Sequence, residues 1–142
     1  MIENAVSSLS PAIRILLVDD FEPWRRSVRS MLEPYQQLAV VDEAVDGLAA
    51  VQRAKELQPD LILLDIALPN LNGVEAAKRL VRVAPASKVV FLSQNSDADV
   101  VEAALSNGAK GYIWKADAGR ELFPAVEAVL HGEEYVSQHV MG

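Results

Sequence analysis

The sequence contains no cysteine and only two histidines, His131 and His139, among its 142 residues. Disulfide bonds and thiolate metal sites are therefore excluded. Two histidines alone are also too few for a typical zinc site, which needs three or four protein ligands. The lack of cysteine fits a protein from a reducing compartment.

Long apolar runs and an excess of positive charge are also missing. The longest apolar stretches are far shorter than a membrane-spanning helix. Residues 1–11 contain no basic segment ahead of an apolar core, so they do not resemble a secretory signal. The net charge of −7 leaves this chain without the basic face that nucleic-acid binding requires. We therefore expect a cytoplasmic protein with no membrane contact.

What the chain does contain is typical of one globular domain. It is 51% hydrophobic and 23% charged, and it is long enough to bury a core. We expect a flexible leader at 1–12, a single domain at 13–131, and the start of a linker or C-terminal tail at 132–142.

Short apolar runs alternate with segments of helical periodicity along the whole domain. The runs predict five buried strands, at 13–18, 38–44, 61–64, 89–92 and 111–114. Helical segments follow from Pro23 to Pro34, from Gly47 to Pro59, after Gly73, at 97–106 and at 120–130. This alternation, with short connections, predicts an α/β fold with a doubly wound parallel sheet and helices on both faces.

Charged side chains stand at the ends of three of the predicted strands. Asp19 and Asp20 follow the first, Asp65 follows the third, and Lys115 follows the fifth. Parallel strands would bring them together at the carboxyl edge of the sheet, where open α/β sheets bind ligands. Two carboxylates about 4 Å apart repel by roughly 4 kcal/mol at an effective dielectric constant of 20. A bound Mg²⁺ would offset that repulsion, and an aspartate can attack phosphorus to form an aspartyl-phosphate.

Each of these signals alone has an ordinary structural explanation. Aspartates after a strand often cap the next helix, and a lysine is usually solvated. Ser93, after the fourth strand, is typical of a turn, and Tyr112 is typical of a half-buried aromatic. Only their joint placement, with polar groups at successive strand ends, favours a phosphoryl site.

The same positions resemble the receiver domain of two-component response regulators, over about 13–131. The matching motifs are Leu17-Val18-Asp19-Asp20, Leu64-Asp65 with Leu68-Pro69, Asn72-Gly73, Ser93, and Gly111-Tyr112-Ile113-Trp114-Lys115. The NarL/LuxR-type branch in particular is resembled by Gly108-Ala109-Lys110-Gly111-Tyr112, Glu121-Leu122, Gly132, Tyr135 and Ser137. The resemblance implies a flavodoxin-like (CheY-like) sheet of five parallel strands.

The resemblance also implies an Mg²⁺ site around the phosphoacceptor. Asp65 would accept the phosphoryl group and would also bind the metal. Asp20 would bind Mg²⁺ directly and Asp19 through a water molecule. Ala67 would contribute its backbone carbonyl oxygen, so its small side chain would not matter there.

Three further residues would bind the phosphoryl group or respond to it. Lys115 would pair with one phosphoryl oxygen and the Ser93 hydroxyl would hydrogen-bond another. Tyr112 would be the switch aromatic, turning inward when Ser93 moves. Gln94, Ala67 and Ala116 stand where many receivers carry other residues, but these departures remove no required chemical group.

The implied partners follow from the same resemblance. A sensor histidine kinase would supply the phosphoryl group, and phosphorylation would promote a homodimer. DNA would be bound only through a C-terminal helix-turn-helix domain that this chain does not contain. The chain would not be an enzyme in the usual sense, since it would catalyse only its own phosphoryl transfer and hydrolysis.

Two other functions are compatible with an aspartate at a strand end. A haloacid-dehalogenase-type phosphohydrolase needs Asp-x-Asp after the first strand, whereas Asp19 and Asp20 are adjacent and Phe21 follows. A receiver that acts only as a phosphorylation-independent dimerisation module would not need the intact acidic set. A Rossmann dinucleotide module is excluded, because no Gly-x-Gly-x-x-Gly follows the first strand.

Overall fold

The computed structural model describes residues 12–138, which form one parallel sheet covered by helices on both faces. The strands of this part of the chain are β1 (Ile13–Val18), β2 (Leu38–Ala44), β3 (Leu61–Leu64), β4 (Lys88–Ser93), β5 (Gly111–Trp114) and β6 (Tyr135–Val136). The helices are α2 (Glu22–Leu32), α3 (Gly47–Leu57), α4 (Gly73–Val83), α5 (Ala98–Ser106), α6 (Ala118–Leu130) and the short 3₁₀ helix η1 (Lys115–Asp117). The predicted α/β parallel architecture is thus confirmed.

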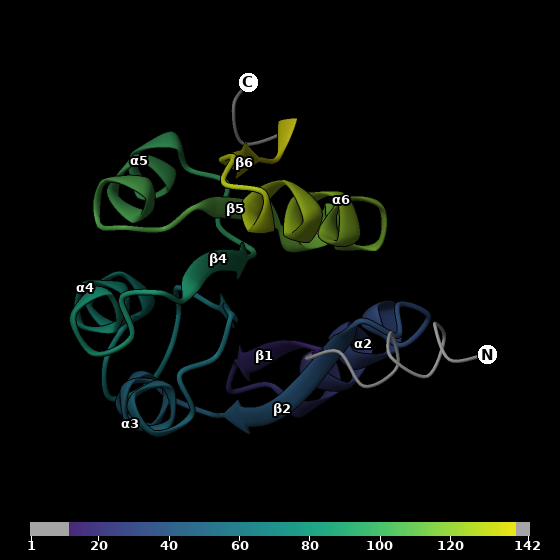
Figure 1. Ribbon diagram of the computed structural model, residues 1–142. Coiled ribbons are helices and arrows are strands. Elements are labelled where there is room, and N and C mark those ends of the chain that lie inside the picture. The colour runs from purple at the N-terminus through teal and green to yellow at the C-terminus, as the bar shows by residue number, and fades with distance from the viewer. Residues whose placement is uncertain (1–11, 139–142) are drawn as a thin grey trace.

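Two hydrophobic cores lie on opposite faces of the sheet because strand side chains alternate in direction. On one face Leu16, Ile62 and Phe91 belong to the core covered by α3, α4 and α5. On the other face their neighbours Leu17 and Leu63 pack with α2 and α6. Figure 1 shows this division, with α3, α4 and α5 on one side of the strands and α2 and α6 on the other. The central strands are buried on both faces, which explains their uninterrupted apolar runs.

The strand order, β2-β1-β3-β4-β5-β6, determines where a site can form. From β1 the chain crosses outward to β2, and it then returns to pair β3 with the other side of β1. The loops after β1 and β3 therefore diverge at this reversal and leave an opening at the carboxyl edge. The acidic residues predicted from the sequence follow these two strands.

Polar side chains begin the helices next to this edge. The carboxylate of Asp46 accepts a hydrogen bond from the Ala49 amide at 2.7 Å and caps α3. The side chain of Asn72 accepts one from the Glu75 amide at 3.0 Å and caps α4. Each cap satisfies an amide at the helix N-terminus that has no partner within the helix.

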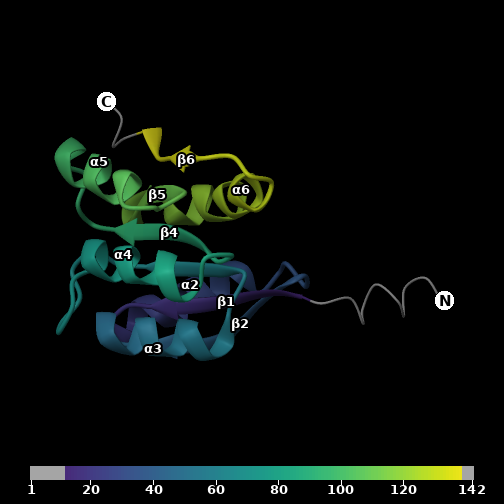
Figure 2. The same ribbon diagram turned by 60° about the vertical axis from the view of Figure 1, so that its left-hand side comes forward.

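The predicted count of five strands is wrong, because the chain adds a sixth strand. In the sequence, 132–142 was expected to be a tail or linker, yet Tyr135–Val136 pairs with β5. Figure 2 shows β6 beside β5, at the end of the sheet opposite β2. Most of the expected leader, at 1–11, and the last four residues of the expected tail lie outside the described residues. In the described part, no helix is long and apolar enough to cross a membrane.

Hydrogen bonds from Ser137 hold β6 in place. The Ser137 hydroxyl is fully buried, donates to the Glu121 carboxylate at 2.7 Å and accepts from the Trp114 amide at 3.0 Å. Its own amide donates to the Tyr112 carbonyl at 2.9 Å, and the Tyr135 hydroxyl donates to Glu121 at 3.2 Å. The chain end is therefore attached to both β5 and α6.

Substitution of Ser137 by alanine should destabilise the domain. It removes hydrogen bonds to Glu121 and Trp114 in a buried place, where an unsatisfied polar group costs about 1–3 kcal/mol. Chemical denaturation should show this loss. The control is Ser30→Ala on the exposed surface of α2, which should change stability by less than about 0.5 kcal/mol. Equal stabilities of the two variants would contradict a structural role for the Ser137 hydroxyl.

Candidate functional site

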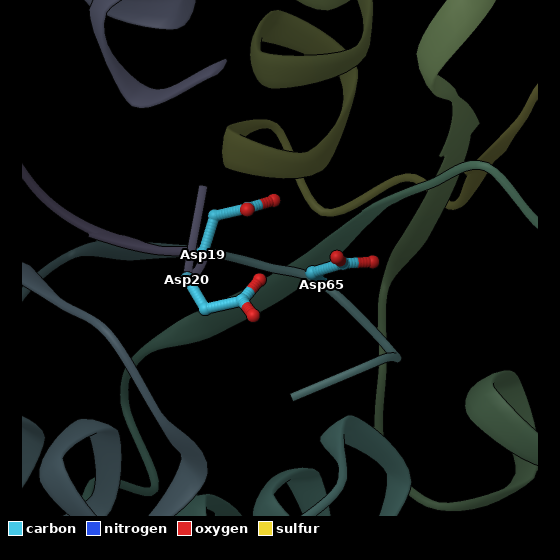
Figure 3. A group of neighbouring side chains, drawn as sticks. All are labelled: Asp19, Asp20 and Asp65. Atoms are coloured by element: carbon cyan, nitrogen blue, oxygen red, sulfur yellow. The ribbon is translucent and has the colours of Figure 1, made fainter. Parts of the chain in front are cut away.

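Asp19, Asp20 and Asp65 lie together at the carboxyl edge of the sheet, as the sequence predicted (Figure 3). One carboxylate oxygen of each lies within 4.8 Å of those of the other two. Backbone bonds that continue the sheet pattern hold two of these residues: the Asp19 amide donates to Ala44 at 3.1 Å and the Asp65 amide to Val18 at 3.2 Å. The cluster is therefore a consequence of parallel pairing.

Lys115 joins the two buried aspartates. Its ammonium lies 2.8 Å from Asp19 Oδ2 and 3.3 Å from Asp65 Oδ2. Asp19 is 1% exposed and Asp65 7%, whereas Asp20 is exposed. The cluster thus holds three carboxylates and one ammonium, which pairs with two of them, and the excess of negative charge is suited to a further cation.

The environment of Asp65 disfavours its ionised form. Burial raises the pKa of Asp65 above the ordinary value of 3.8, and the charge of Asp19 raises it further. The Lys115 ammonium and a hydrogen bond from the Ile66 amide oppose these effects without cancelling them. Like-charge contact and desolvation are the usual means by which a site perturbs a carboxyl group.

A chain of hydrogen bonds links Ser93 with Tyr112. The Ser93 hydroxyl, at the end of β4, accepts from the Asn95 amide at 3.0 Å, and the Tyr112 hydroxyl donates to the Asn95 carbonyl at 2.6 Å. Tyr112 is fully buried, and burial is the main cause that raises the pKa of its phenol. The family resemblance implies that Tyr112 turns inward when Ser93 moves, which stays a prediction; in this structure its side chain is already fully buried.

Two cavities open next to the charged residues, one beside Asp65 and the other beside Lys115. One, of about 310 Å³, is lined by Asp65, Ile66, Ala67, Ser93, Gln94 and Asn95. The other, of about 180 Å³, is lined by Phe21, Pro23, Trp24, Ser27, Gln94 and Lys115. Gln94 lines both cavities. Ala67 and Ser93 therefore line one cavity together with Asp65.

The donor set suits a hard divalent cation. Carboxylate oxygens and water are the ligands that such ions prefer, and Asp20 lies at the solvent-exposed side where water can complete a coordination shell. Asp19 already accepts hydrogen bonds from the Phe21 amide at 2.9 Å and from Lys115. Both of its oxygens are thus engaged by donors of the protein itself.

Two residues at the site were not identified from the sequence. The Lys115 ammonium lies 5.1 Å from the centre of the Trp24 ring, within the range of a cation–π interaction. From the sequence, Trp24 was predicted only to lie among the apolar positions of a helix. Asn95 contributes main-chain atoms, which no side-chain pattern reveals. For Trp24 the sequence held one signal: it is a large aromatic residue in the first turn of the helix that follows Asp19 and Asp20.

The fold and the site together define a signalling domain of the receiver class. The sequence model described as the response regulator receiver domain matches residues 15–127, and the chain therefore belongs to this family. Its NarL/LuxR-type character, predicted from the sequence, is also confirmed by its relatives. A two-component response regulator of the LuxR family from Aurantimonas sp. SI85-9A1 has a crystal structure that superposes with a TM-score of 0.87 at 31% identity, covering 92% of this chain and 93% of that one.

Curated relatives agree with this assignment. The transcriptional regulatory protein LiaR of Bacillus subtilis is 35% identical over 130 residues, which are 92% of this chain and 62% of LiaR. The response regulator UvrY of Escherichia coli K12 is 30% identical over 128 residues, which are 90% of this chain and 59% of UvrY. The chain thus spans about three fifths of the length of these relatives.

The raised pKa of Asp65 predicts how pH affects stability. Between pH 3.8 and the raised value, the folded chain retains a proton that the unfolded chain has lost, so the unfolding free energy falls as pH rises. Asp65→Asn cannot ionise and should be more stable than the wild type near neutral pH in metal-free buffer. The difference should vanish below pH 3.8. If Asp65→Asn were less stable than the wild type at neutral pH, the attraction of Lys115 for the ionised Asp65 would outweigh the cost of burying that charge.

Gly73 should be required for the position of Asp65. A Cβ atom at Gly73 would overlap the Asp65 carbonyl oxygen and lie 2.7 Å from Ile66 Cα, so backbone would have to move. Gly73→Ala should lower the free energy of unfolding by about 1–3 kcal/mol, as overpacking does, because the backbone at Asp65 has to move. Gly119→Ala on α6 is the control, because nothing lies within 4 Å of its Cβ. It should be neutral or stabilising by up to about 1 kcal/mol.

Proposed function

We propose that Asp65 accepts a phosphoryl group from a phosphohistidine of a sensor histidine kinase, with Mg²⁺ bound at the acidic cluster. The observation that supports this most directly is Lys115, whose ammonium contacts both Asp19 and Asp65 beside an open cavity. A carboxylate oxygen of Asp65 attacks phosphorus, the new O–P bond forms, and the P–N bond to the imidazole breaks. The histidine leaves with the electron pair and takes up a proton.

The side chains around Asp65 bind and orient the reacting groups. Lys115, held by Asp19, presents positive charge to a phosphoryl oxygen, and the Ser93 hydroxyl donates to another. Asp20, the Asp65 carboxylate, the Ala67 carbonyl and, through water, Asp19 would hold Mg²⁺. When bound, the metal supplies positive charge that stabilises the charge on the transferring group. By itself the chain would catalyse only its own phosphoryl transfer and hydrolysis.

The hydrogen-bond chain from Ser93 through Asn95 to Tyr112 supports a switch. A phosphoryl group that binds the Ser93 hydroxyl would alter the bond that Ser93 accepts from the Asn95 amide. The fraction of molecules in which Tyr112 lies inward, bonded to the Asn95 carbonyl, would then change. Reversing a 1:99 ratio takes about 5.5 kcal/mol of differential stabilisation. The surface of α5, β5 and α6 would carry the change to a homodimer.

The output of this switch is proposed from the relatives. Because the chain spans about three fifths of LiaR and UvrY, we propose that the receiver domain runs from 13 through strand β6, past the expected boundary at 131, and that the segment after β6 leads to an output domain. That domain would be a DNA-binding helix-turn-helix, as the NarL/LuxR-type resemblance implies, and would regulate transcription in the cytoplasm. DNA would be bound by this output domain alone, since the described chain carries an excess of acidic residues.

Intact mass spectrometry tests the proposal directly. The protein is incubated with Mg²⁺ and a small acyl phosphate, in parallel with Asp65→Asn and with a sample that contains a chelator. One added phosphoryl group should appear in the wild type, and it should be absent from the variant and from the chelated sample.

Other outcomes would contradict the proposal. An adduct that persists in Asp65→Asn would place the phosphoacceptor elsewhere. Continuous release of phosphate, with many turnovers and no trapped adduct, would instead indicate a phosphohydrolase.

A further inference from the structure

Arg25 connects the acidic site to a strand that carries no site residue. Its Nε donates to the Glu43 carboxylate on β2 at 2.6 Å, and its Nη1 donates to the Asp19 carbonyl oxygen at 2.7 Å. The side chain is only 12% exposed. Planar guanidinium groups can make two such bonds in fixed directions, whereas a lysine ammonium cannot reproduce this fork.

The Glu43 carboxylate is a firm anchor for this bridge. Its second oxygen accepts from Arg29 at 2.6 Å, so two arginines of α2 share one carboxylate. Its main chain lies in β2, where Glu43 pairs with Leu17 of β1. Because Glu43 is held in the sheet, Arg25 restrains the Asp19 carbonyl relative to β2.

The Asp19 carbonyl belongs to the peptide group that joins Asp19 to Asp20. The amide of Asp19 is already held by Ala44, and its carboxylate by Phe21 and Lys115. Arg25 adds a bond at the carbonyl, which fixes the plane of the peptide that leads into Asp20. Asp20 is exposed, so the direction of its carboxylate depends on this backbone more than on packing of the side chain.

We infer that Arg25 is a positioning residue for divalent-cation binding: by holding the Asp19–Asp20 peptide against Glu43, it orients the Asp20 carboxylate toward Asp65. This inference rests on the proposed function, since it assumes that Mg²⁺ binds at the acidic cluster. Partners of this kind, one step removed from the metal ligands, commonly change metal affinity by tenfold or more when they are replaced.

The charge of Arg25 has the opposite effect on cation binding. A guanidinium near the cluster repels Mg²⁺, so its removal would raise affinity by electrostatics and obscure the loss of orientation. Arg25→Lys separates the two effects, because it keeps the charge and loses the fork. Arg29→Lys is the matched control: it also keeps the charge and also alters the contact with Glu43, but within the described part of the chain Arg29 makes no hydrogen bond to Asp19.

The test is a titration of the metal-free protein with Mg²⁺, in which binding is monitored through the NMR chemical shifts of the backbone amides around Asp20. Arg25→Lys should raise the Kd for Mg²⁺ about tenfold. Arg29→Lys should stay within about twofold of the wild type. Thermal unfolding of both variants is also measured in the presence of a chelator. A merely structural role of Arg25 would change the melting temperatures but leave the two variants with the same Kd for Mg²⁺.

Each outcome has a definite meaning. The inference would be overturned if Arg25→Lys left the Kd for Mg²⁺ unchanged, or if Arg29→Lys raised the Kd as much as Arg25→Lys does. In either case, Mg²⁺ binding by the wild type would leave the proposed function intact. Absence of Mg²⁺ binding in the wild type, with Asp20→Asn as the reference for lost binding, would instead overturn the proposed metal site and with it the inference.

Discussion

The ion pairs of Lys115 with Asp19 and Asp65 are the interaction on which the site depends. They join the residues that follow β1, β3 and β5, so one ammonium spans most of the sheet's carboxyl edge. Both carboxylates are buried, and a buried charge without a partner is strongly destabilising. The same ammonium that makes the cluster tolerable in the folded protein is also placed to meet incoming negative charge. One side chain thus stabilises the buried carboxylates and, in the proposed function, binds the phosphoryl group as well.

Hydrogen bonds connect the elements next to the Lys115 ion pairs, from the end of β4 through β5 to the segment after β6. Ser93, Asn95 and Tyr112 are linked by hydrogen bonds from the end of β4 to β5. Ser137 donates to the Tyr112 carbonyl, so the last described segment is attached to the strand that carries the aromatic ring. A chain of hydrogen bonds therefore runs from Ser93, which lines the cavity next to Asp65, to the last described segment of the domain. Packed interiors pass structural changes on because they deform little.

Sequence patterns predicted the central architecture correctly for clear physical reasons. Strands buried on both faces read as uninterrupted apolar runs, as in Leu61–Leu64, and parallel strands must end at the same edge. The positions of Asp19, Asp65 and Lys115 follow from these two facts. β6 was missed because two residues provide no periodicity. It exists through pairing with β5 and through the Ser137 hydrogen bonds.

The sequence by itself determined the fold class, the strand ends and the charged groups gathered there, because these depend on periodicity and on the direction of parallel strands. Tertiary structure alone decided how those groups are held. Arg25 reaches the Asp19 carbonyl from α2 while bound to β2, and Trp24 lies under the Lys115 ammonium. Asn95 acts through main-chain atoms. Such contacts join segments distant in sequence or use atoms common to all residues, so no local pattern encodes them.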